Sequence, residues 1–264
     1  MSVMDAFGDA AVLQRPDAAS TSANGRGATV NRYTVDNFFR TDRNELTIAE
    51  PANSDFELSP AFSGWQSRAK RAFDVIVALV AILGLGPLLL LAALAIVVES
   101  RGPVFFRQVR EGKNGKPFMA WKFRSMRTDS CDATGVKQTV AGDKRVTKVG
   151  KILRKTSIDE LPQLFNVLRG DMSLVGPRPH VSGMLAGGMS YRELVPYYDL
   201  RLLVTPGLTG WAQANGFRGP TDDAEAARQR IDYDLAYVRE FNLLLDIKVI
   251  FLTLKREFIG GSGH

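Results

Sequence analysis

The sequence predicts an α+β fold, mainly helical with a small β-hairpin, that sits in one leaflet of a membrane. Residues 75–98 form an uncharged apolar run, and residues 101–127 alternate aromatic and basic side chains in two short strand-like stretches. Helical patterns fill most of the remainder. We therefore expect a monotopic membrane protein with a proline-broken re-entrant helix and interfacial amphipathic helices, built as one domain over residues 61–264.

Composition excludes several classes of catalyst. The 264 residues include one cysteine, Cys131, and two histidines, His180 and His264. These numbers leave no disulfide framework and no cysteine-rich metal site, and they nearly exclude serine–histidine or cysteine–histidine catalysis. Chemistry must therefore depend on carboxylates, lysine or tyrosine, with an oxygen-liganded metal if there is one. We interpret His180 as an ordinary loop histidine.

Charge is distributed unevenly along the chain. Residues 1–60 carry 5 basic and 9 acidic side chains, whereas residues 61–264 carry 29 and 19. Most of the basic surplus lies in residues 101–155, with 15 basic and 4 acidic side chains. Such a domain attracts nucleic acid, anionic lipid or phosphorylated substrates. No zinc finger, RNP-type strand or recognisable helix-turn-helix accompanies the charge, so we do not expect nucleic acid as a partner.

The first 60 residues are rich in small and polar side chains and have little apolar periodicity, which predicts a disordered tail. The start of the chain lacks the basic and apolar regions of a signal peptide, so we expect none.

The apolar run VIVALVAILGLGPLLLLAALAIVV, residues 75–98, is long enough to span a membrane as a helix. Pro87 stands at its centre and removes a helical hydrogen bond, which leaves two halves of about 16 Å each in a bilayer core of about 30 Å. Both flanks are basic, with Arg68, Lys70, Arg71, Arg101, Arg107, Arg110, Lys113 and Lys116. Basic flanks predict that both ends lie in the cytoplasm. We therefore prefer a segment that enters, bends at Pro87 and returns, over a single crossing.

Asp74 lies at the membrane edge of the first half of this segment. We expect it to pair with Arg71 or with a later arginine.

The basic and aromatic stretch after the apolar run predicts a β-hairpin. Val104–Val109 and Pro117–Phe123 have the pattern of short strands, and Gly112–Lys116 supplies the turn. Lys122 and Arg124 have two interpretations. One is a solvated basic face against anionic lipid headgroups, and the other is binding of substrate phosphates by Lys122 or Arg124; the two can hold for different residues.

The segment Arg154–Pro179 is the strongest candidate for a functional site. It combines the carboxylates Asp159, Glu160 and Asp171 with the cations Arg154, Lys155, Arg169 and Arg178. Ser157 and Glu160 fit a helix capping box, which explains at least one carboxylate structurally. Pro162 conflicts with a helix that begins there, and such conflicts concentrate at functional sites. Acids beside bases predict an anionic substrate, a divalent metal, or both.

Further helical patterns fill the rest of the chain. Lys144–Arg154 predicts a basic helix, and Tyr191–Leu203 predicts another. A helix is expected to start at Pro220–Asp223 and to run through about Glu240, and it contains the DxD pair Asp232 and Asp234. Leu243–Phe258 is apolar and amphipathic, and it fits either a membrane surface or the core.

Four stretches of the sequence together resemble the bacterial sugar transferase family, the monotopic phosphoglycosyl transferases. They are FRQVREGKNGKPFMAWKFRSMR, LRKTSIDELPQLFNVLRGDMSLVGPRP, TPGLTGWAQANG, and YDLAYV with LLLDIKVI. The resemblance covers about residues 66–258 in order, and it is greatest to exopolysaccharide-type undecaprenyl-phosphate galactose phosphotransferases. It implies transfer of a phosphosugar, of galactose or glucose type, from a UDP-sugar to undecaprenyl phosphate with release of UMP. It places this first membrane step of exopolysaccharide biosynthesis at the cytoplasmic face of the bacterial inner membrane.

The resemblance also implies roles for individual residues. Asp159 would be the nucleophile that forms a covalent phosphosugar intermediate, and Glu160 would hold Mg²⁺. Arg154 and Arg178 would bind phosphate, and Asp234 would assist as an acid–base or metal-side carboxylate. The family breaks its membrane helix at a Ser-Pro or similar pair, where this chain has Gly86-Pro87.

Two other functions remain open from the sequence. Asp232 and Asp234 could form the metal site of an ordinary glycosyltransferase that releases UDP, although they lie in a helical pattern rather than in a loop after a strand. The chain could also be a basic membrane tether whose acid pairs merely cap helices. Whether it forms a homo-oligomer is left open as well.

Overall fold

The computed structural model describes residues 56–127, 143–219 and 222–260, without the side chains of residues 257–260. The predicted tail, residues 1–60, lies almost entirely outside the described residues. The elements in chain order are η2 (Pro60–Phe62), α2 (Gly64–Glu99), β1 (Phe105–Glu111), η3 (Lys113–Gly115), β2 (Pro117–Phe123), α3 (Lys148–Lys155), η5 (Ile158–Glu160), α4 (Gln163–Arg169), β3 (Ser173–Val175), β4 (Leu185–Ala186), β5 (Met189–Ser190), α5 (Tyr191–Leu194), η6 (Tyr198–Leu203), β6 (Gly207–Thr209), α6 (Trp211–Ala214), α7 (Ala224–Glu240) and α8 (Leu243–Gly260).

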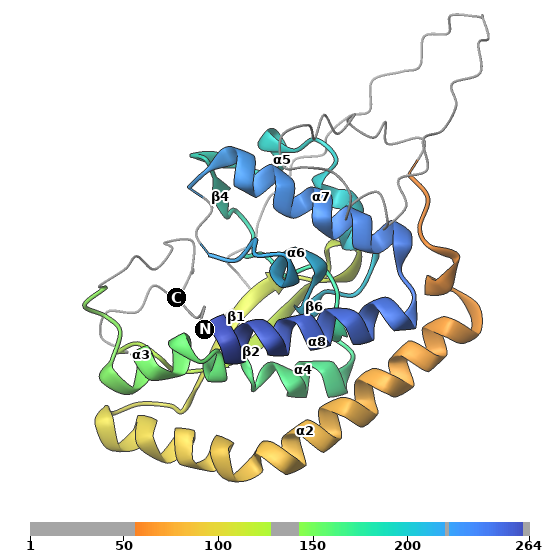
Figure 1. Cartoon of the computed structure of the whole chain (residues 1–264). Helices are drawn as coiled ribbons and strands as arrows, with labels where there is room; N and C mark the ends of the chain where they lie inside the picture. The colour runs from red at the N-terminus through yellow and green to blue at the C-terminus, as the bar shows by residue number, and fades with distance from the viewer. Residues whose placement is uncertain (1–55, 128–142, 220–221, 261–264) are drawn as a thin grey trace, which may run out of the picture.

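Helix α2 runs along one edge of the molecule, opposite α7, and changes direction midway (Figure 1). It is a continuous helix of 36 residues with Pro87 inside it. Within the described ranges it is the one helix long and apolar enough to cross a membrane, judged by length and composition alone. Most of its apolar side chains face outward, and Leu83 is 78% exposed. The predicted apolar helix is therefore present, and it is bent rather than folded back on itself.

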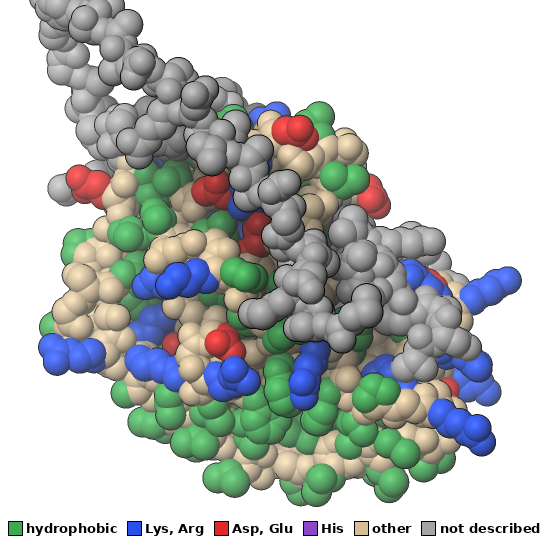
Figure 2. All heavy atoms as spheres, turned by 180° about the vertical axis from the view of Figure 1, so that it is seen from behind, with side chains coloured by type: hydrophobic (Ala, Val, Ile, Leu, Met, Phe, Trp, Pro, Cys, Tyr) green, Lys and Arg blue, Asp and Glu red, His purple; other side chains and the backbone are tan. Residues whose placement is uncertain are grey.

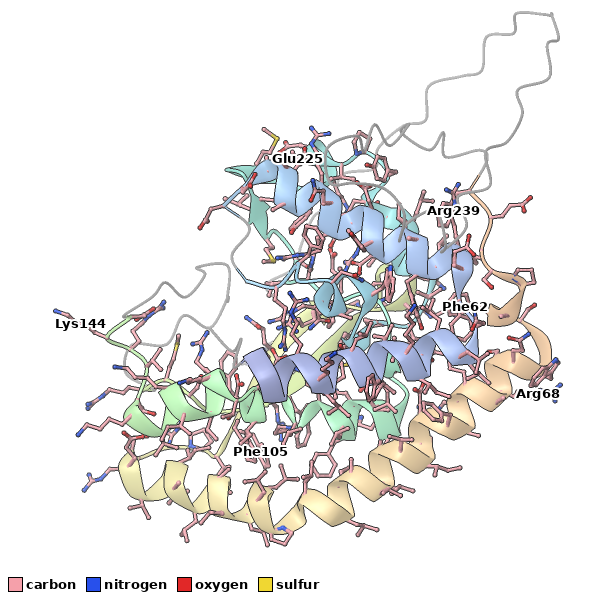
Figure 3. The ribbon with its side chains drawn as sticks, in the orientation of Figure 1. Phe62, Arg68, Phe105, Lys144, Glu225 and Arg239 are labelled. Atoms are coloured by element: carbon pink, nitrogen blue, oxygen red, sulfur yellow. The ribbon has the colours of Figure 1, made fainter. Side chains whose placement is uncertain are left out.

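Apolar side chains gather along the edge of the molecule that α2 forms, and Lys and Arg side chains lie in a row beside them (Figure 2). Arg68 points away from the body of the protein near the start of α2 (Figure 3). Helix α8 adds an exposed apolar stripe, with Leu244, Ile247 and Phe251 spaced three and four residues apart. Its opposite side is buried in the main core. Both predicted placements of this helix, on a membrane surface and in the core, are therefore compatible with the structure, each for a different face.

Strands β1 and β2 form the predicted antiparallel hairpin, with Phe105 opposite Phe123. The first strand lies one to two residues later than predicted. Asn114 and Gly115 have φ angles of 55° and 71°, the left-handed conformation that asparagine and glycine tolerate best, so the chain reverses there. Phe123 is buried against the second half of α2 and against α3, and Phe105 packs beside it (Figure 3).

The main core lies between the first half of α2, α4, β3, α6, α7 and α8. Asp223 caps the start of α7, as the acidic sequence before it predicted. The prediction of a single helix over 191–203 is wrong. Two short helical elements replace it, because α5 ends at Leu194 and η6 begins at Tyr198. Pro196 explains the break, since it has no N–H and forces the residue before it out of the helical conformation.

The predicted partner of Asp74 is also wrong. Asp74 accepts hydrogen bonds from the Ser173 hydroxyl at 2.8 Å and from the Leu174 N–H at 3.1 Å. Arg71 instead donates to two carbonyls in the last turn of α4. The first half of α2 is thus bound to both α4 and β3.

Candidate active site

Asp159 and Glu160 lie on a tight turn rather than in a regular helix. After α3 ends, Ser157 adopts a left-handed φ of 55°, and the single turn η5 follows. The expected capping box does not form, because Ser157 makes no capping hydrogen bond to the turn. Pro162 stands at the N-cap of α4, where its missing N–H costs no helical bond. The conflict in the sequence is resolved by dividing the segment into two short elements.

The carboxylate of Glu160 is surrounded by cations. Lys122 Nζ lies 2.7 Å from Oε1, and Arg178 donates to both oxygens, at 2.5 Å and 3.1 Å. Arg218 lies 4.0 Å from Oε2. Burial alone would raise the pKa of Glu160, but the charges of Arg178 and Lys122 outweigh burial and hold this pKa well below its usual range. Glu160 is therefore ionised throughout the physiological range.

Asp159 lies beside this cluster but does not share its ion pairs. It is 9% exposed, and none of the described residues donates a hydrogen bond to its carboxylate. Burial raises the pKa of Asp159 to about 6, because the charge of Lys122 offsets only part of the burial effect and the charge of Glu160 adds to the rise. The side chain is thus a relatively basic carboxylate whose oxygens are available to a substrate.

Cations outnumber carboxylates around this pair. Lys122, Arg178 and Arg218 contact or approach Glu160, and the charge of Arg154, half-buried in the last turn of α3, acts on Asp159. Arg110 contributes a fifth positive charge, and burial together with the charge of Arg178 lowers its pKa to about 10. A surplus of positive charge in a partly buried site is suited to a substrate with several phosphate charges.

The site residues predicted from the sequence did not include Arg110, which was named only in the basic flank of the apolar run, or Arg218. Arg110 lies on the same face of the hairpin as Lys122, because Lys122 pairs with Phe106 and side chains alternate along the strand. The alternation of side chains along the strand, from Phe106 to Gln108 to Arg110, was the signal that could have placed Arg110 on this face. Arg218 lies between Gly216 and Gly219, both with positive φ, in a loop after α6. Its position depends on tertiary packing, for which the sequence has no local signal.

Arg178 is held in place by a short parallel ladder and a close-packed loop. Strands β3 and β6 pair in parallel, with Ser173 opposite Gly207. The chain then passes through Gly176, where a Cβ atom would lie only 2.6 Å from the Thr205 carbonyl oxygen, so glycine is required. The segments around Gly176 and Gly207 thus pack directly against each other and aim Arg178 at Glu160.

Asp234 lies behind Arg178 and supports it. Arg201 donates to the Arg178 carbonyl at 2.5 Å and to Asp234 at 2.7 Å and 2.9 Å, in a fully buried pair. Burial raises the pKa of Asp234, and the charge of Arg201 opposes the rise. The contacts give Asp234 a structural role, and they do not bring it to Asp159.

The two carboxylates of the DxD pair serve different partners. Asp232 accepts a hydrogen bond from the Tyr197 hydroxyl at 2.9 Å, whereas Asp234 binds Arg201. Across the described ranges no group of three His, Cys, Asp or Glu side chains is placed to hold a metal. Because the Asp232 and Asp234 carboxylates bind different partners, their contacts do not favour a shared metal site of a UDP-releasing glycosyltransferase at this pair.

Arg124 is engaged elsewhere. It is buried, and it donates to the carbonyls of Ser100 at 2.7 Å and Arg101 at 2.5 Å, which follow the end of α2. These contacts bind Arg124 to the segment that follows α2. They do not support the phosphate-binding role predicted for Arg124, whereas Lys122, two residues earlier on the strand, does reach the site.

The donor set is chemically compatible with Mg²⁺. Carboxylate oxygens are hard ligands, and Mg²⁺ often binds through one or two carboxylates completed by substrate phosphates and water. Asp159 and Glu160 supply two such groups. Both oxygens of Glu160 are engaged by cations, so a metal at Glu160 requires Lys122 and Arg178 to turn toward substrate phosphates.

Residues 65–260 match the sequence model of the family described as bacterial sugar transferase. The chain is also similar to the exopolysaccharide production protein PSS of Rhizobium leguminosarum bv. phaseoli, with 55% identity over 194 residues. It is 52% identical over 195 residues to the undecaprenyl-phosphate glucose phosphotransferase of Komagataeibacter xylinus. It is 48% identical over 202 residues to the UDP-glucose:undecaprenyl-phosphate glucose-1-phosphate transferase of Escherichia coli K12.

These matches cover similar shares of this chain and different shares of the relatives. Each includes about three quarters of this chain, at 74%, 74% and 76%. They include 97% of the Rhizobium protein but only 37% and 43% of the Komagataeibacter and Escherichia proteins. The family match over residues 65–260 includes the Asp159–Glu160 dyad, the hairpin and all but the first residue of α2.

Proposed function

Because the chain belongs to the bacterial sugar transferase family, we propose that it transfers a sugar 1-phosphate from a UDP-sugar to undecaprenyl phosphate and releases UMP. The observation that best supports this proposal is the position of Asp159. Its buried carboxylate has available oxygens and lies beside an excess of cations. Two of the relatives have glucose in their names, so we propose glucose before galactose as the sugar. The relatives' names also favour a role in exopolysaccharide synthesis.

In the first step an oxygen of Asp159 attacks the sugar-bearing phosphorus of the UDP-sugar. A bond forms between this oxygen and phosphorus, and the bond from phosphorus to the bridging oxygen of the diphosphate breaks. That oxygen leaves with its electron pair as part of UMP, and the sugar phosphate remains on Asp159 as an acyl phosphate. Lys122, Arg178 and Arg218 are placed to stabilise the negative charge that moves onto the leaving phosphate.

In the second step a phosphate oxygen of undecaprenyl phosphate attacks the same phosphorus. The bond to Asp159 breaks, the carboxylate is regenerated, and the product is the lipid diphosphate sugar. No water and no net proton transfer are needed, because the attacking phosphate is already ionised. Burial of Asp159 helps to exclude water, which would otherwise hydrolyse the intermediate.

We also propose Mg²⁺ as the cofactor, with Glu160 as its protein ligand and oxygens of the donor diphosphate completing the site. When bound, the ion would neutralise phosphate charge and polarise the bond to the leaving group.

The proposed membrane arrangement places α2 in one leaflet, with both ends at the cytoplasmic face of the bacterial inner membrane. Three observations support it: the bend in α2, the exposed apolar side chains along this edge, and the row of basic side chains beside them (Figure 2). One substrate is water-soluble and the other is a lipid, so a site at the boundary serves both.

The test uses purified protein in detergent with Mg²⁺, a panel of UDP-sugars, and undecaprenyl phosphate present or absent. The released nucleotide is identified by chromatography, and the mass of the intact protein is measured by mass spectrometry. We expect UMP and a phosphosugar adduct that forms without lipid, and both should disappear in Asp159→Asn. Release of UDP instead would support the DxD glycosyltransferase and contradict this proposal. Chelation of Mg²⁺ should reduce UMP release to background.

A further inference from the structure

We propose that Asp74 and Lys70, in the first half of α2, are positioning residues that set the place of Arg178 in the active site. This role rests on the proposed function, in which Arg178 holds a substrate phosphate. It connects the helix proposed to lie in the membrane with the phosphate-binding side of the dyad.

Asp74 binds the start of β3. Its Oδ2 accepts from the Ser173 hydroxyl at 2.8 Å and its Oδ1 accepts from the Leu174 N–H at 3.1 Å. Only 2% of Asp74 is exposed. A charged group that is almost fully buried is costly unless it is paired and hydrogen-bonded, so these contacts define the position of the strand closely.

Lys70, one helical turn before Asp74, binds the end of the same strand. Its Nζ donates to the Val175 carbonyl at 3.1 Å and to Asp246 of α8 at 2.6 Å. The Tyr237 hydroxyl of α7 lies 2.8 Å from Asp246 Oδ1 and 3.1 Å from the same Val175 carbonyl oxygen, and it shares its one proton between them. This buried network therefore fixes β3 from α2, α7 and α8 at once.

The connection from β3 to Arg178 has little freedom. Only Gly176 and Pro177 separate the strand from Arg178, and the Gly176 N–H donates to the Thr209 carbonyl at 2.9 Å. A Cβ atom at Gly176 would overlap the Thr205 carbonyl, which shows how closely the backbones pack. A displacement of β3 is thus passed to Arg178, whose guanidinium must reach Glu160 with both donors.

The test is a double-mutant cycle between Asp74→Ala and Arg178→Lys, with kcat/KM for UDP-glucose measured in detergent. We expect Asp74→Ala alone to lower kcat/KM at least tenfold. When Arg178→Lys is already present, Asp74→Ala should lower kcat/KM less than twofold, because both changes act on the placement of the Arg178 guanidinium. Asp74→Asn keeps one acceptor oxygen for the Leu174 N–H and should recover part of the loss. Equal losses in both backgrounds would overturn the proposal.

Arg71→Met is the matched control, because Arg71 lies in the same half of α2 but binds α4. It should lower Tm comparably, while its effect on kcat/KM should be the same in both backgrounds.

Hydrogen exchange separates this proposal from the proposed function, because it needs no substrate. Asp74→Ala should increase exchange in residues 173–178, whereas Arg71→Met should increase it in α4. Unchanged exchange over 173–178 would refute the positioning role even in an active enzyme.

Absence of UMP release from the wild type would refute the proposed function, while the exchange result would still decide whether α2 holds this loop. Asp74→Asn replaces Asp74→Ala in both measurements if the alanine variant does not fold.

Discussion

At the residue scale, Asp159 and Glu160 are adjacent in the chain and have opposite surroundings. Glu160 carries the ion pairs to Lys122 and Arg178, and its pKa lies well below the usual range because these charges outweigh burial. Asp159 is buried without such pairs, and its pKa is raised to about 6. A pair of carboxylates whose environments separate their pKa values is a common arrangement for dividing two roles between similar groups. One is suited to hold charge and the other to react.

The raised pKa of Asp159 predicts the pH dependence of the first step. Only the ionised carboxylate attacks, so kcat/KM for the UDP-sugar should fall below a midpoint near pH 6 and be about tenfold lower at pH 5 than its plateau. The measurement is initial UMP release from pH 4.5 to 8.5. A midpoint near pH 4 would mean that Asp159 is solvated as an ordinary aspartate.

The same shift predicts that Asp159 destabilises the folded protein at neutral pH. An acid whose folded-state pKa exceeds its unfolded value binds more protons when folded, so stability falls as pH rises from about 4 to 6 and stays low above. Asp159→Asn should therefore raise Tm at pH 7.5, by the equivalent of at most about 3 kcal/mol. The gain should shrink at pH 5. The exposed Asp222→Asn is the control and should not change Tm at either pH.

Apart from Lys122 on the hairpin, the candidate-site residues that could be predicted lie close together in the sequence. Asp159, Glu160 and Arg178 share one short segment, and its density of charge identified them as a site. Arg218 reaches Glu160 only through the packing of a distant loop, and Arg124 turns to the end of α2 because that helix ends beside it. His180, expected in a loop, is buried with its Nδ1 3.1 Å from the Tyr198 hydroxyl. Such placements depend on tertiary contacts and leave no local pattern.

At the element scale, the prediction succeeded where one periodic pattern decided the structure. The apolar run became α2, the alternating strands became the hairpin, and the capped pattern became α7. It failed where a proline and the core competed with a helical pattern. Pro196 divides the segment 191–203, and the turn at Ser157 replaces the expected capping box. Short 3₁₀ turns at such places are set by packing more than by propensity.

Pro87 should determine the shape of α2. In Pro87→Ala the backbone gains an N–H that can complete the helical ladder, so we expect a straighter α2 and a population that crosses the bilayer. The measurement is labelling of Arg101→Cys in a Cys131→Ser background by a membrane-impermeant maleimide in intact spheroplasts. Labelling should be near background with Pro87 and should rise severalfold in Pro87→Ala.

Gly84→Ala is the matched control for Pro87→Ala, because it raises helix propensity in the same segment without adding a donor. A Cβ atom at Gly84 has nothing within 4 Å. Labelling of Gly84→Ala should equal that of the parent. Strong labelling of the parent itself would contradict the one-leaflet arrangement.

At the scale of the whole molecule, charge and apolar surface occupy separate regions. Residues 61–264 carry a net charge of +10. Lys and Arg side chains lie in a row beside the apolar edge (Figure 2), and Lys122, Arg178 and Arg218 lie around Glu160. In the proposed function, this separation would bring the soluble donor and the lipid acceptor to one boundary. The uneven charge along the sequence predicted the basic face, although it could not show which cations enter the site.

The positive field predicts a dependence on ionic strength. Raising NaCl from 0.05 to 0.5 M should lower kcat/KM for the UDP-sugar severalfold and leave kcat nearly unchanged, because screening weakens the attraction of the anionic donor before it is bound. The measurement is initial UMP release in nonionic detergent, where the charge of a bilayer plays no part. A change in kcat alone would contradict this explanation.

In the proposed one-leaflet arrangement, the bend in α2 has a mechanical consequence for the bilayer. A helix that enters and leaves through one surface adds its cross-sectional area to a single leaflet and leaves the other unchanged. Each inserted molecule thereby acts as a wedge that favours outward curvature of the leaflet it occupies. Insertion should be more favourable in small, strongly curved vesicles than in large, flat ones of the same lipids, and crowding of the enzyme should place the occupied leaflet under lateral compression.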